Sequence, residues 1–196
     1  GLENPLRKDT ANFKKHVAEG GAIYIKNCVY CHGSHEMNKP SSQTARMNKQ
    51  HVAETCAKCH GEVDKVYEQS IHGTALAKGN LDAPVCTDCH GEHNIFAPSD
   101  PRSRVAAKNV SSQVCSPCHS SVALSAKYGL ANDRFKTFSD SYHGLALRGG
   151  SLEVANCASC HGSHNIKPST DSTSSTYKGN LAVTCGRCHP GANARF

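Results

Sequence analysis

The sequence predicts a fold of short helices and irregular coil with little or no sheet. Apolar residues make up 37% of the 196 residues, aromatic residues 6%, and tryptophan is absent. Side chains alone therefore offer too little apolar area to offset the conformational entropy of the chain. Gly, Pro, Ser and Asn interrupt the helical periodicity, and no segment alternates apolar and polar residues as a strand does. The core is expected to come from something other than packed side chains.

A five-residue pattern, Cys-x-x-Cys-His, occurs six times and uses all twelve cysteines. Two thiols at this spacing can form thioethers to the vinyl groups of one porphyrin, and the next imidazole can bind its iron. A zinc ribbon or a thioredoxin-like dithiol explains one Cys-x-x-Cys, but neither requires a His after each one. The sequence thus predicts a multihaem cytochrome c in which coil and short helices wrap around a chain of six covalently attached haems c. The motifs are Cys28/Cys31/His32, Cys56/Cys59/His60, Cys86/Cys89/His90, Cys115/Cys118/His119, Cys157/Cys160/His161 and Cys185/Cys188/His189.

Local patterns predict where the elements lie along the chain. Short helical turns are expected around each motif, with longer helices at residues 13–22 and 121–128. The longest gap between motifs contains residues 128–133 and is expected to be the loosest joint. The polar stretch 169–176 is expected to be a surface loop.

The chain contains an internal repeat. A shift of 71 residues carries the Ser-x-His-Gly sequence at Ser70 onto that at Ser141, and the third motif onto the fifth. A shift of 129 residues carries the first two motifs onto the last two. The repeat predicts three two-haem modules, residues 1–62, 63–130 and 131–196.

Thirteen histidines minus the six in the motifs leave seven that could be distal iron ligands. Each module has one three residues after its first motif and one upstream of that motif, so each is expected to supply its own two ligands. The seventh, His51, falls where the other modules have Asn109 and Asn180. One of His16 and His51 is expected to serve the first module, and the other to be exposed or to reach a haem of a neighbouring subunit. Met37 and Met47 are alternative ligands or packing residues. The candidate distal ligands are His16, His35, His51, His72, His93, His143 and His164.

Small residues accompany many of these histidines. Ser70 and Ser141 are expected to orient the chain before His72 and His143. The glycines that follow histidines are expected either to allow close approach of the backbone to a porphyrin or to form ordinary turns. They are Gly33, Gly61, Gly73, Gly91, Gly144 and Gly162.

Residues 63–196 resemble the multihaem c-type cytochromes of metal- and sulfur-respiring bacteria. The resemblance lies in Ser-x-His-Gly followed by Cys-Thr-Asp-Cys-His-Gly-Glu-His-Asn-Ile and then by Cys-Ala-Ser-Cys-His-Gly-Ser-His-Asn-Ile. Residues 21–28 also resemble the lead-in of single-haem cytochromes. The family implies haems with two axial histidines, in a closely spaced chain that relays electrons. Its members act beside a membrane cytochrome b or as extracellular filaments.

Charge and hydropathy restrict the partners and the compartment. The formal charge of +6 is offset by six ferric haems at about −1 each, and no basic run is interleaved with aromatic residues, so no nucleic-acid partner is expected. No apolar run approaches the roughly 20 residues that span a bilayer. Because haem is attached covalently outside the cytoplasm and the chain opens without a signal-like segment, we expect a secreted, periplasmic or extracellular protein whose signal peptide has been removed.

The surplus of histidines over irons predicts an electron carrier and not an enzyme, because substrate chemistry at a haem needs an open coordination position. We expect electron transfer through closely spaced bis-His haems, with redox proteins as partners, in a homo-oligomer or filament that serves as an extracellular conduit. One alternative is a monomeric periplasmic shuttle to or from a membrane quinone-linked complex. Another is a multihaem reductase of a small oxyanion or sulfur compound, which would need a five-coordinate haem.

Overall fold

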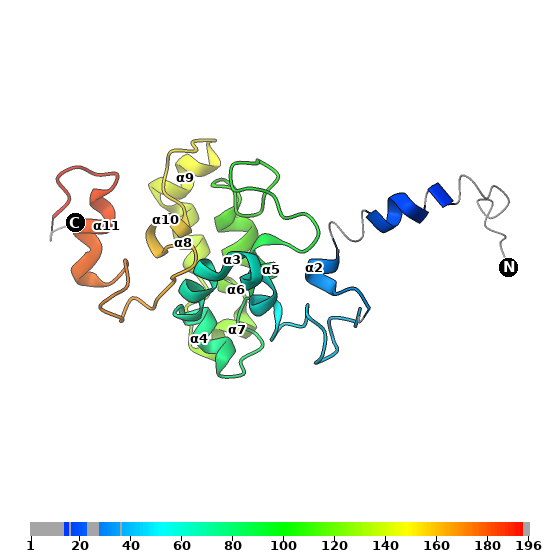
Figure 1. Cartoon of the computed structure of the whole chain (residues 1–196). Coiled ribbons are helices and arrows are strands. Elements are labelled where there is room, and N and C mark those ends of the chain that lie inside the picture. Colours follow the sequence, from blue (N-terminus) through cyan, green and yellow to red (C-terminus); the bar gives the residue numbers. More distant parts are fainter. Residues whose placement is uncertain (1–13, 16, 23–27, 36, 194–196) are drawn as a thin grey trace. The chain divides into compact units, whose positions relative to one another are not determined.

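The computed structural model describes residues 14–15, 17–22, 28–35 and 37–193 (Figure 1). In this part of the chain, helices alternate with turns and loops and no residue is in a strand, which confirms the expected class of helices and coil without a sheet. Nor is any described helix both long and apolar enough to cross a bilayer.

Most of the motifs lie on short helices, as expected, and the helix expected at 121–128 is present as α7. Residues 14–15 and 17–22 of the other expected helix are helical, whereas Phe13 and His16 lie outside the described residues. Helices α4, α8 and α9 were not expected from the sequence. The α-helices are α2 (Val29–His32), α3 (Val52–Glu68), α4 (Ile71–Ala77), α5 (Cys86–His90), α6 (Ser116–His119), α7 (Val122–Tyr128), α8 (Arg134–Asp140), α9 (Tyr142–Arg148), α10 (Cys157–His161) and α11 (Leu181–Gly186).

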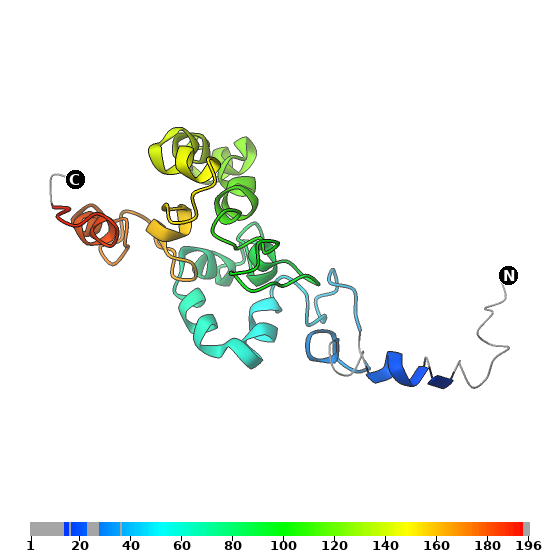
Figure 2. The ribbon, with the colours of Figure 1, turned by 90° about the horizontal axis from the view of Figure 1, so that it is seen from above.

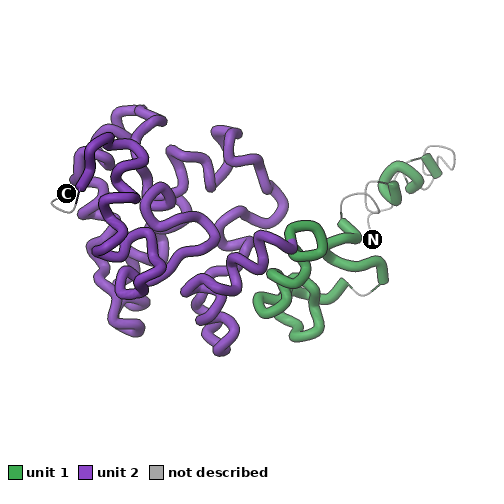
Figure 3. Tube along the Cα trace, turned by 60° about the vertical axis from the view of Figure 1, so that its left-hand side comes forward, with its two compact units in different colours: residues 1–60 green, residues 61–196 purple. Residues whose placement is uncertain are grey.

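The chain divides into two compact units, Gly1–His60 and Gly61–Phe196 (Figure 3). The second unit contains the whole of the second and third predicted modules together with residues 61–62 of the first. Within it, α6 and α10 both contact a π-helix, η2 (Val110–Cys115), and α8 contacts α9 (Figure 2). Motifs four and five are thereby held against a common element.

The side-chain core is small. The buried apolar residues are small or medium-sized, and many large apolar side chains of the described chain are exposed, among them Val122, Tyr142 and Val183. Such a protein gains little from burying its own apolar surface, so another apolar component would have to supply the core. The buried apolar residues in the described chain are Ala45, Val52, Ala83, Val85, Ala106 and Val110.

A series of turns precedes the second motif of each module. In residues 39–51, backbone N–H groups of Ser42, Ala45, Asn48 and His51 each donate to the carbonyl three residues earlier. Residues 97–109 and 168–180 repeat the same four hydrogen bonds at equivalent positions. The last series ends in a short 3₁₀-helix, η3 (Lys178–Asn180). We call these segments the turn series; they show that the sequence repeat is also a structural repeat.

The second module differs from the others by one residue. From the last residue of the turn series to the next cysteine the chain advances six residues in the second module (Asn109 to Cys115), but five in the first (His51 to Cys56) and the third (Asn180 to Cys185). The π-helix η2 lies at this point. Because a π-turn contains one more residue than an α-turn, the extra residue is absorbed without shifting the flanking segments.

Candidate functional site

A serine begins each helix that carries an upstream histidine. Ser70 Oγ accepts a hydrogen bond from Gly73 N (3.0 Å), and Ser141 Oγ accepts one from Gly144 N (3.3 Å). These N-caps start α4 and α9 and place His72 and His143 in the first turn. The expected orienting role of the two serines therefore has a physical basis.

The glycines beside these caps fit the second of the two expected reasons, the formation of turns. A Cβ at Gly73 would collide with the Tyr67 carbonyl, and one at Gly144 with the Phe138 carbonyl. The glycines allow the chain to turn sharply between two helices. This local backbone contact is a sufficient reason for glycine at both positions. Gly91 and Gly162, by contrast, have φ values of 85° and 79° and end α5 and α10.

Three pairs of histidine rings face each other across a gap. The ring centroids of His72 and His119 lie 6.3 Å apart, and those of His143 and His189 lie 6.0 Å apart. In each case a motif histidine faces the capped histidine of the same module. These two pairs are equivalent under the repeat.

The third pair crosses the module boundary. His90 of the second module faces His164 of the third, with centroids 6.0 Å apart and ring planes at 8°. Nearby, Ile71 N donates to Ile166 O (2.8 Å). The expectation that every module supplies both of its own distal ligands stays a prediction, but the ring that faces His90 comes from the next module.

These separations fit a metal ion bound between two imidazoles. A metal-bound imidazole nitrogen lies about 2 Å from the ion and its ring centre roughly 1 Å farther, so two imidazoles on opposite sides have centroids about 6 Å apart. The described residues contain no group of three or more His, Cys, Asp and Glu that could hold an ion by themselves. The remaining ligands would have to come from a cofactor, as the four porphyrin nitrogens of haem do.

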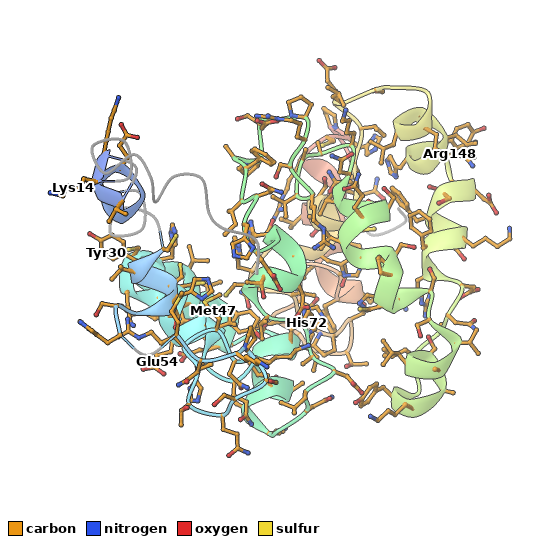
Figure 4. The ribbon with its side chains drawn as sticks, turned by 90° about the vertical axis from the view of Figure 1, so that its right-hand side faces the viewer. Lys14, Tyr30, Met47, Glu54, His72 and Arg148 are labelled. Atoms are coloured by element: carbon orange, nitrogen blue, oxygen red, sulfur yellow. The ribbon has the colours of Figure 1, made fainter. Side chains whose placement is uncertain are left out.

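Burial favours the neutral form of one pair, His72 and His119, and of the motif histidine His161. Burial, aided by the nearby His119, lowers the pKa of His72 to about 4, and burial also lowers the pKa of His119 and His161. Figure 4 shows His72 among the side chains of the second unit. A neutral imidazole is the form that binds a metal.

No disulfide joins any of the twelve cysteines, all of which lie in the described part of the chain. Cys115 of the fourth motif and Cys157 of the fifth are joined by a hydrogen bond between their side chains, which lowers the pKa of Cys157 to about 6 and raises that of Cys115. Ser111 supports this contact, because its Oγ accepts a hydrogen bond from Cys157 N (3.1 Å). The repeat gave no signal for Ser111, which belongs to the π-helix.

Exposure separates the cysteines that the sequence treats as equivalent. Eight are partly covered by the protein, but the second cysteine of the first, second, fourth and sixth motifs is exposed. These four are Cys31, Cys59, Cys118 and Cys188. Twelve cysteines in equivalent surroundings would be covered to a similar extent, but the protein's own side chains leave these four exposed. Their role in attaching haem stays a prediction, and a porphyrin bound there would itself have to cover the sulfur.

The second cysteines of the third and fifth motifs show the contrast. Cys89 and Cys160 are partly covered, and Ser175 of the polar stretch 169–176 donates a hydrogen bond to the Cys160 carbonyl. Both motifs are the first of their modules, so each is followed by a turn series of its own module. Cys31 also precedes a turn series and is nevertheless exposed. The repeat in sequence therefore does not fix how well a motif is covered.

Neighbouring motifs of the second unit affect one another in sequence order. Burial is the main cause that raises the pKa of Cys89, and Cys118 of the fourth motif adds to it. Burial likewise raises the pKa of Cys160, with Cys185 of the sixth motif as the next cause. Motifs three, four, five and six therefore lie next to one another along the unit.

The first unit contains most of the other candidates, whereas His93 belongs to the second unit. His35 is exposed and its Nδ1 lies 2.9 Å from Ser34 Oγ; with Gly33, Thr44 and Arg46 these residues line a cleft of about 270 Å³. Among the described residues, no histidine ring faces His35, His60 or His161 as in the three pairs. His16 lies outside the described residues, and no contact places Met37 or Met47 near a motif.

His51 makes a local hydrogen bond in place of a ring pair. Its Nε2 lies 2.9 Å from the Gln43 carbonyl, eight residues earlier. Asn109 Nδ2 donates to the Pro101 carbonyl (3.0 Å), and Asn180 Nδ2 to the Ser172 carbonyl (2.8 Å), again eight residues earlier. His51 thus does what the asparagines do at the end of the other turn series.

No family model, curated protein or solved structure matches this chain. The arrangement of its residues is therefore the basis on which a function can be proposed.

Proposed function

We propose that this chain is a hexahaem c-type cytochrome that transfers electrons through haems with two axial histidines. The observation that carries the proposal is the set of three ring pairs, each made of one motif histidine and one other histidine, at centroid separations of 6.0–6.3 Å. One proximal histidine from a motif and one distal histidine from elsewhere is the combination that a bis-His haem c requires.

The chain's residues divide into three roles. The twelve motif cysteines attach the porphyrins, the six motif histidines bind the irons on the proximal side, and His72, His143 and His164 bind on the distal side of motifs four, six and three. Haem iron with two axial imidazoles supplies reversible one-electron transfer. Ser70 and Ser141 cap the helices that carry two of the distal histidines.

The succession of motifs three to six supports a relay of electrons. Neighbouring motifs in the sequence are also neighbours in the second unit, as the hydrogen bond between Cys115 and Cys157 and the electrostatic effect of Cys185 on Cys160 indicate. Electrons would then pass along the order of the sequence. Redox proteins outside the cytoplasm are the partners that such a relay requires.

An enzyme remains the alternative of a different class. A reductase of a small oxyanion or sulfur compound would need an iron without a distal ligand, and the described residues show no ring facing His60 or His161. We favour the carrier because seven histidines outside the motifs suffice for six irons. A monomeric periplasmic shuttle and a subunit of an extracellular filament are both compatible with the carrier function.

Haem stoichiometry and spin state test the proposal. The protein is produced in a host that attaches haem c, and haem is counted by the pyridine haemochrome assay and examined by electron paramagnetic resonance at high protein concentration. We expect six haems per chain with low-spin ferric signals. Fewer than six haems, or high-spin signals from several haems together with carbon monoxide binding to the reduced protein, would contradict the carrier function.

A further inference from the structure

One position of the turn series differs in charge between the modules. It is the eighth residue of each series, and it is a cation in the first two modules and a neutral residue in the third. The three residues at this position are Arg46, Arg104 and Ser175. Because the turn series is a structural repeat, the three side chains start from equivalent places in the backbone.

Both arginines reach the end of the first motif of their own module. A Cβ at Gly33 would lie 3.5 Å from Arg46 Cζ, and a Cβ at Gly91 would lie 4.0 Å from Arg104 Cδ. Burial is the main cause that raises the pKa of Cys89 in the third motif, and the charge of Arg104 acts against it. A haem bound at either motif would therefore have a guanidinium near its point of attachment.

The third module keeps this contact without the charge. The Ser175 hydroxyl donates a hydrogen bond to the Cys160 carbonyl of the fifth motif. Its backbone is anchored as in the first module, since Thr184 Oγ1 donates to the Ser175 carbonyl (2.7 Å) and Thr55 Oγ1 to the Arg46 carbonyl (2.8 Å). The two modules thus differ in the charge of this side chain and not in the anchoring of its backbone.

Arg104 is held more firmly than Arg46. Its Nη2 donates to the Gln113 carbonyl (2.9 Å), so the guanidinium lies between the third motif and the π-helix that leads into the fourth. Arg104 is also partly buried, whereas Arg46 is exposed. A charge that is held in place and partly shielded from water acts more strongly on its surroundings than an exposed one.

We propose that Arg104 and Arg46 raise the reduction potentials of the haems at the third and first motifs. The inference rests on the proposed function, because it requires haems at these motifs. A haem loses one unit of positive charge when an electron from a redox partner reduces its iron from ferric to ferrous. A neighbouring cation therefore stabilises the reduced form, whether the guanidinium lies against the porphyrin or binds a propionate.

Other cations lie near the fifth motif, so the neutral Ser175 does not by itself rank the potential of that haem. Burial lowers the pKa of His161, and the charge of Arg134 is a further cause. Burial raises the pKa of Cys160, and the charge of Arg187 acts against it. The effect of the eighth residue is therefore measured by exchanging its charge and not by comparing the six haems with each other.

Two substitutions of Arg104 separate its charge from its hydrogen bond. Arg104→Gln removes the charge but keeps an amide N–H that can donate to the Gln113 carbonyl. Arg104→Lys keeps the charge and is the matched control. Ser175→Arg adds the charge to the third module, at the position where the other two modules already have it. Haem content and far-ultraviolet circular dichroism confirm that each variant is folded.

Redox titration of the holoproteins, followed by visible absorbance and electron paramagnetic resonance, tests the proposal. We expect Arg104→Gln to lower the midpoint potential of one haem in six and Arg104→Lys to leave it near the native value. Arg46→Gln should cause a smaller decrease, which added salt reduces further because Arg46 is exposed. Ser175→Arg should raise one midpoint. Unchanged midpoints in Arg104→Gln or in folded Ser175→Arg, or equal decreases in Arg104→Gln and Arg104→Lys, would overturn the proposal.

His164→Ala identifies the affected haem and separates this inference from the proposed function. Because His164 faces His90, its removal should make the haem at the third motif high-spin, so that its reduction can be followed apart from the others. If Arg104→Gln does not lower the midpoint of this high-spin haem, the inference fails and the electron-transfer function stands. If His164→Ala produces no high-spin haem, the ligand assignment of the proposed function fails, and the titrations in the native background alone decide the role of Arg104.

Discussion

Two kinds of histidine outside the motifs have opposite surroundings in this protein. His72 and His143 are each presented on a serine-capped helix with an imidazole facing them at 6.3 and 6.0 Å. His51 ends a turn series, with Nε2 2.9 Å from a backbone carbonyl of the same segment. Both groups consist of histidines. They differ in whether a backbone group nearby uses the imidazole as its hydrogen-bond partner.

The difference shows what makes a histidine available as a ligand. Asn109 and Asn180 close their turn series through a side-chain N–H, and an imidazole N–H can make the same bond. At the capped helices, Ser70 and Ser141 accept the hydrogen bonds of the first-turn N–H groups. The imidazoles of His72 and His143 are therefore not required for a local hydrogen bond to the backbone. A surplus of histidines over irons is then explained by structure and not by a further metal site.

The largest expected effect comes from replacing a paired histidine. His72→Ala and His143→Ala should each convert one of the six haems from low-spin to high-spin, because each removes one distal ligand, and the reduced variants should bind one carbon monoxide per chain. Electron paramagnetic resonance and carbon monoxide titration measure these changes. His51→Asn is the control and should leave six low-spin haems. A low-spin spectrum in both alanine variants would remove the distinction between the two kinds of histidine.

The glycines of the capped helices should come next in magnitude. Gly73→Ala and Gly144→Ala each place a methyl group against a backbone carbonyl that cannot move independently, so we expect a loss of roughly 1–3 kcal/mol or more in the free energy of unfolding. Chemical denaturation of the holoprotein measures it.

Gly186→Ala provides the matched control for these glycines. An added Cβ at Gly186 meets nothing within 4 Å, and Ala158 already occupies the same place in the fifth motif. Its stability should be unchanged or slightly higher, because alanine favours a helix more than glycine does. Equal losses in Gly73→Ala and Gly186→Ala would show that the contact with Tyr67 does not require glycine.

The sequence predicted which residues belong to the candidate site better than it predicted which of them face each other. The spacing of the motifs and the repeat were sufficient to nominate His72, His143 and His164, because both are local in the chain. The pairing of His90 with His164 could not be predicted, since it depends on how one module packs against the next. The helices α4, α8 and α9 were missed, although α7, which has the same length of seven residues, was predicted. The starting points of α4 and α9 depend on caps, and Ser70 and Ser141 were noticed only for their nearness to histidine.

The exposure of the cysteines in each motif could not be predicted from the sequence either. Cys31, Cys59 and Cys188 have the same spacing to a histidine as Cys89 and Cys160, yet the first three are exposed and the other two are partly covered. The difference depends on which distant segment packs over a motif, as Ser175 does at Cys160. Spacing within five residues carries no information about such a segment.

The serine caps should have a moderate effect. Ser70→Ala and Ser141→Ala each remove the acceptor for a backbone N–H of the first turn, so we expect about 1 kcal/mol lower stability in each. Chemical denaturation of the holoprotein measures this loss. Because the imidazole would then be held less firmly, the low-spin signal of the corresponding haem should also broaden. The conservative Ser→Thr variants keep a cap and should restore both properties; if they do not, the serines act through packing and not through the hydrogen bond.

The smallest effect is expected at His51, and it decides whether the comparison holds. His51→Ala should lose about 1 kcal/mol of stability, the net contribution of one hydrogen bond, without any change in the number or spin state of the haems. His51→Asn should regain this loss, because the amide N–H can donate to the Gln43 carbonyl as Asn109 and Asn180 donate to theirs. Denaturation curves and resonance spectra of the two variants, recorded on the same samples, separate the hydrogen-bonding role from a ligand role. If His51→Asn keeps its stability but gains one high-spin haem, His51 is a ligand when haem is bound. It would then bind iron through Nδ1 while Nε2 donates to the Gln43 carbonyl, or through Nε2 after that hydrogen bond breaks.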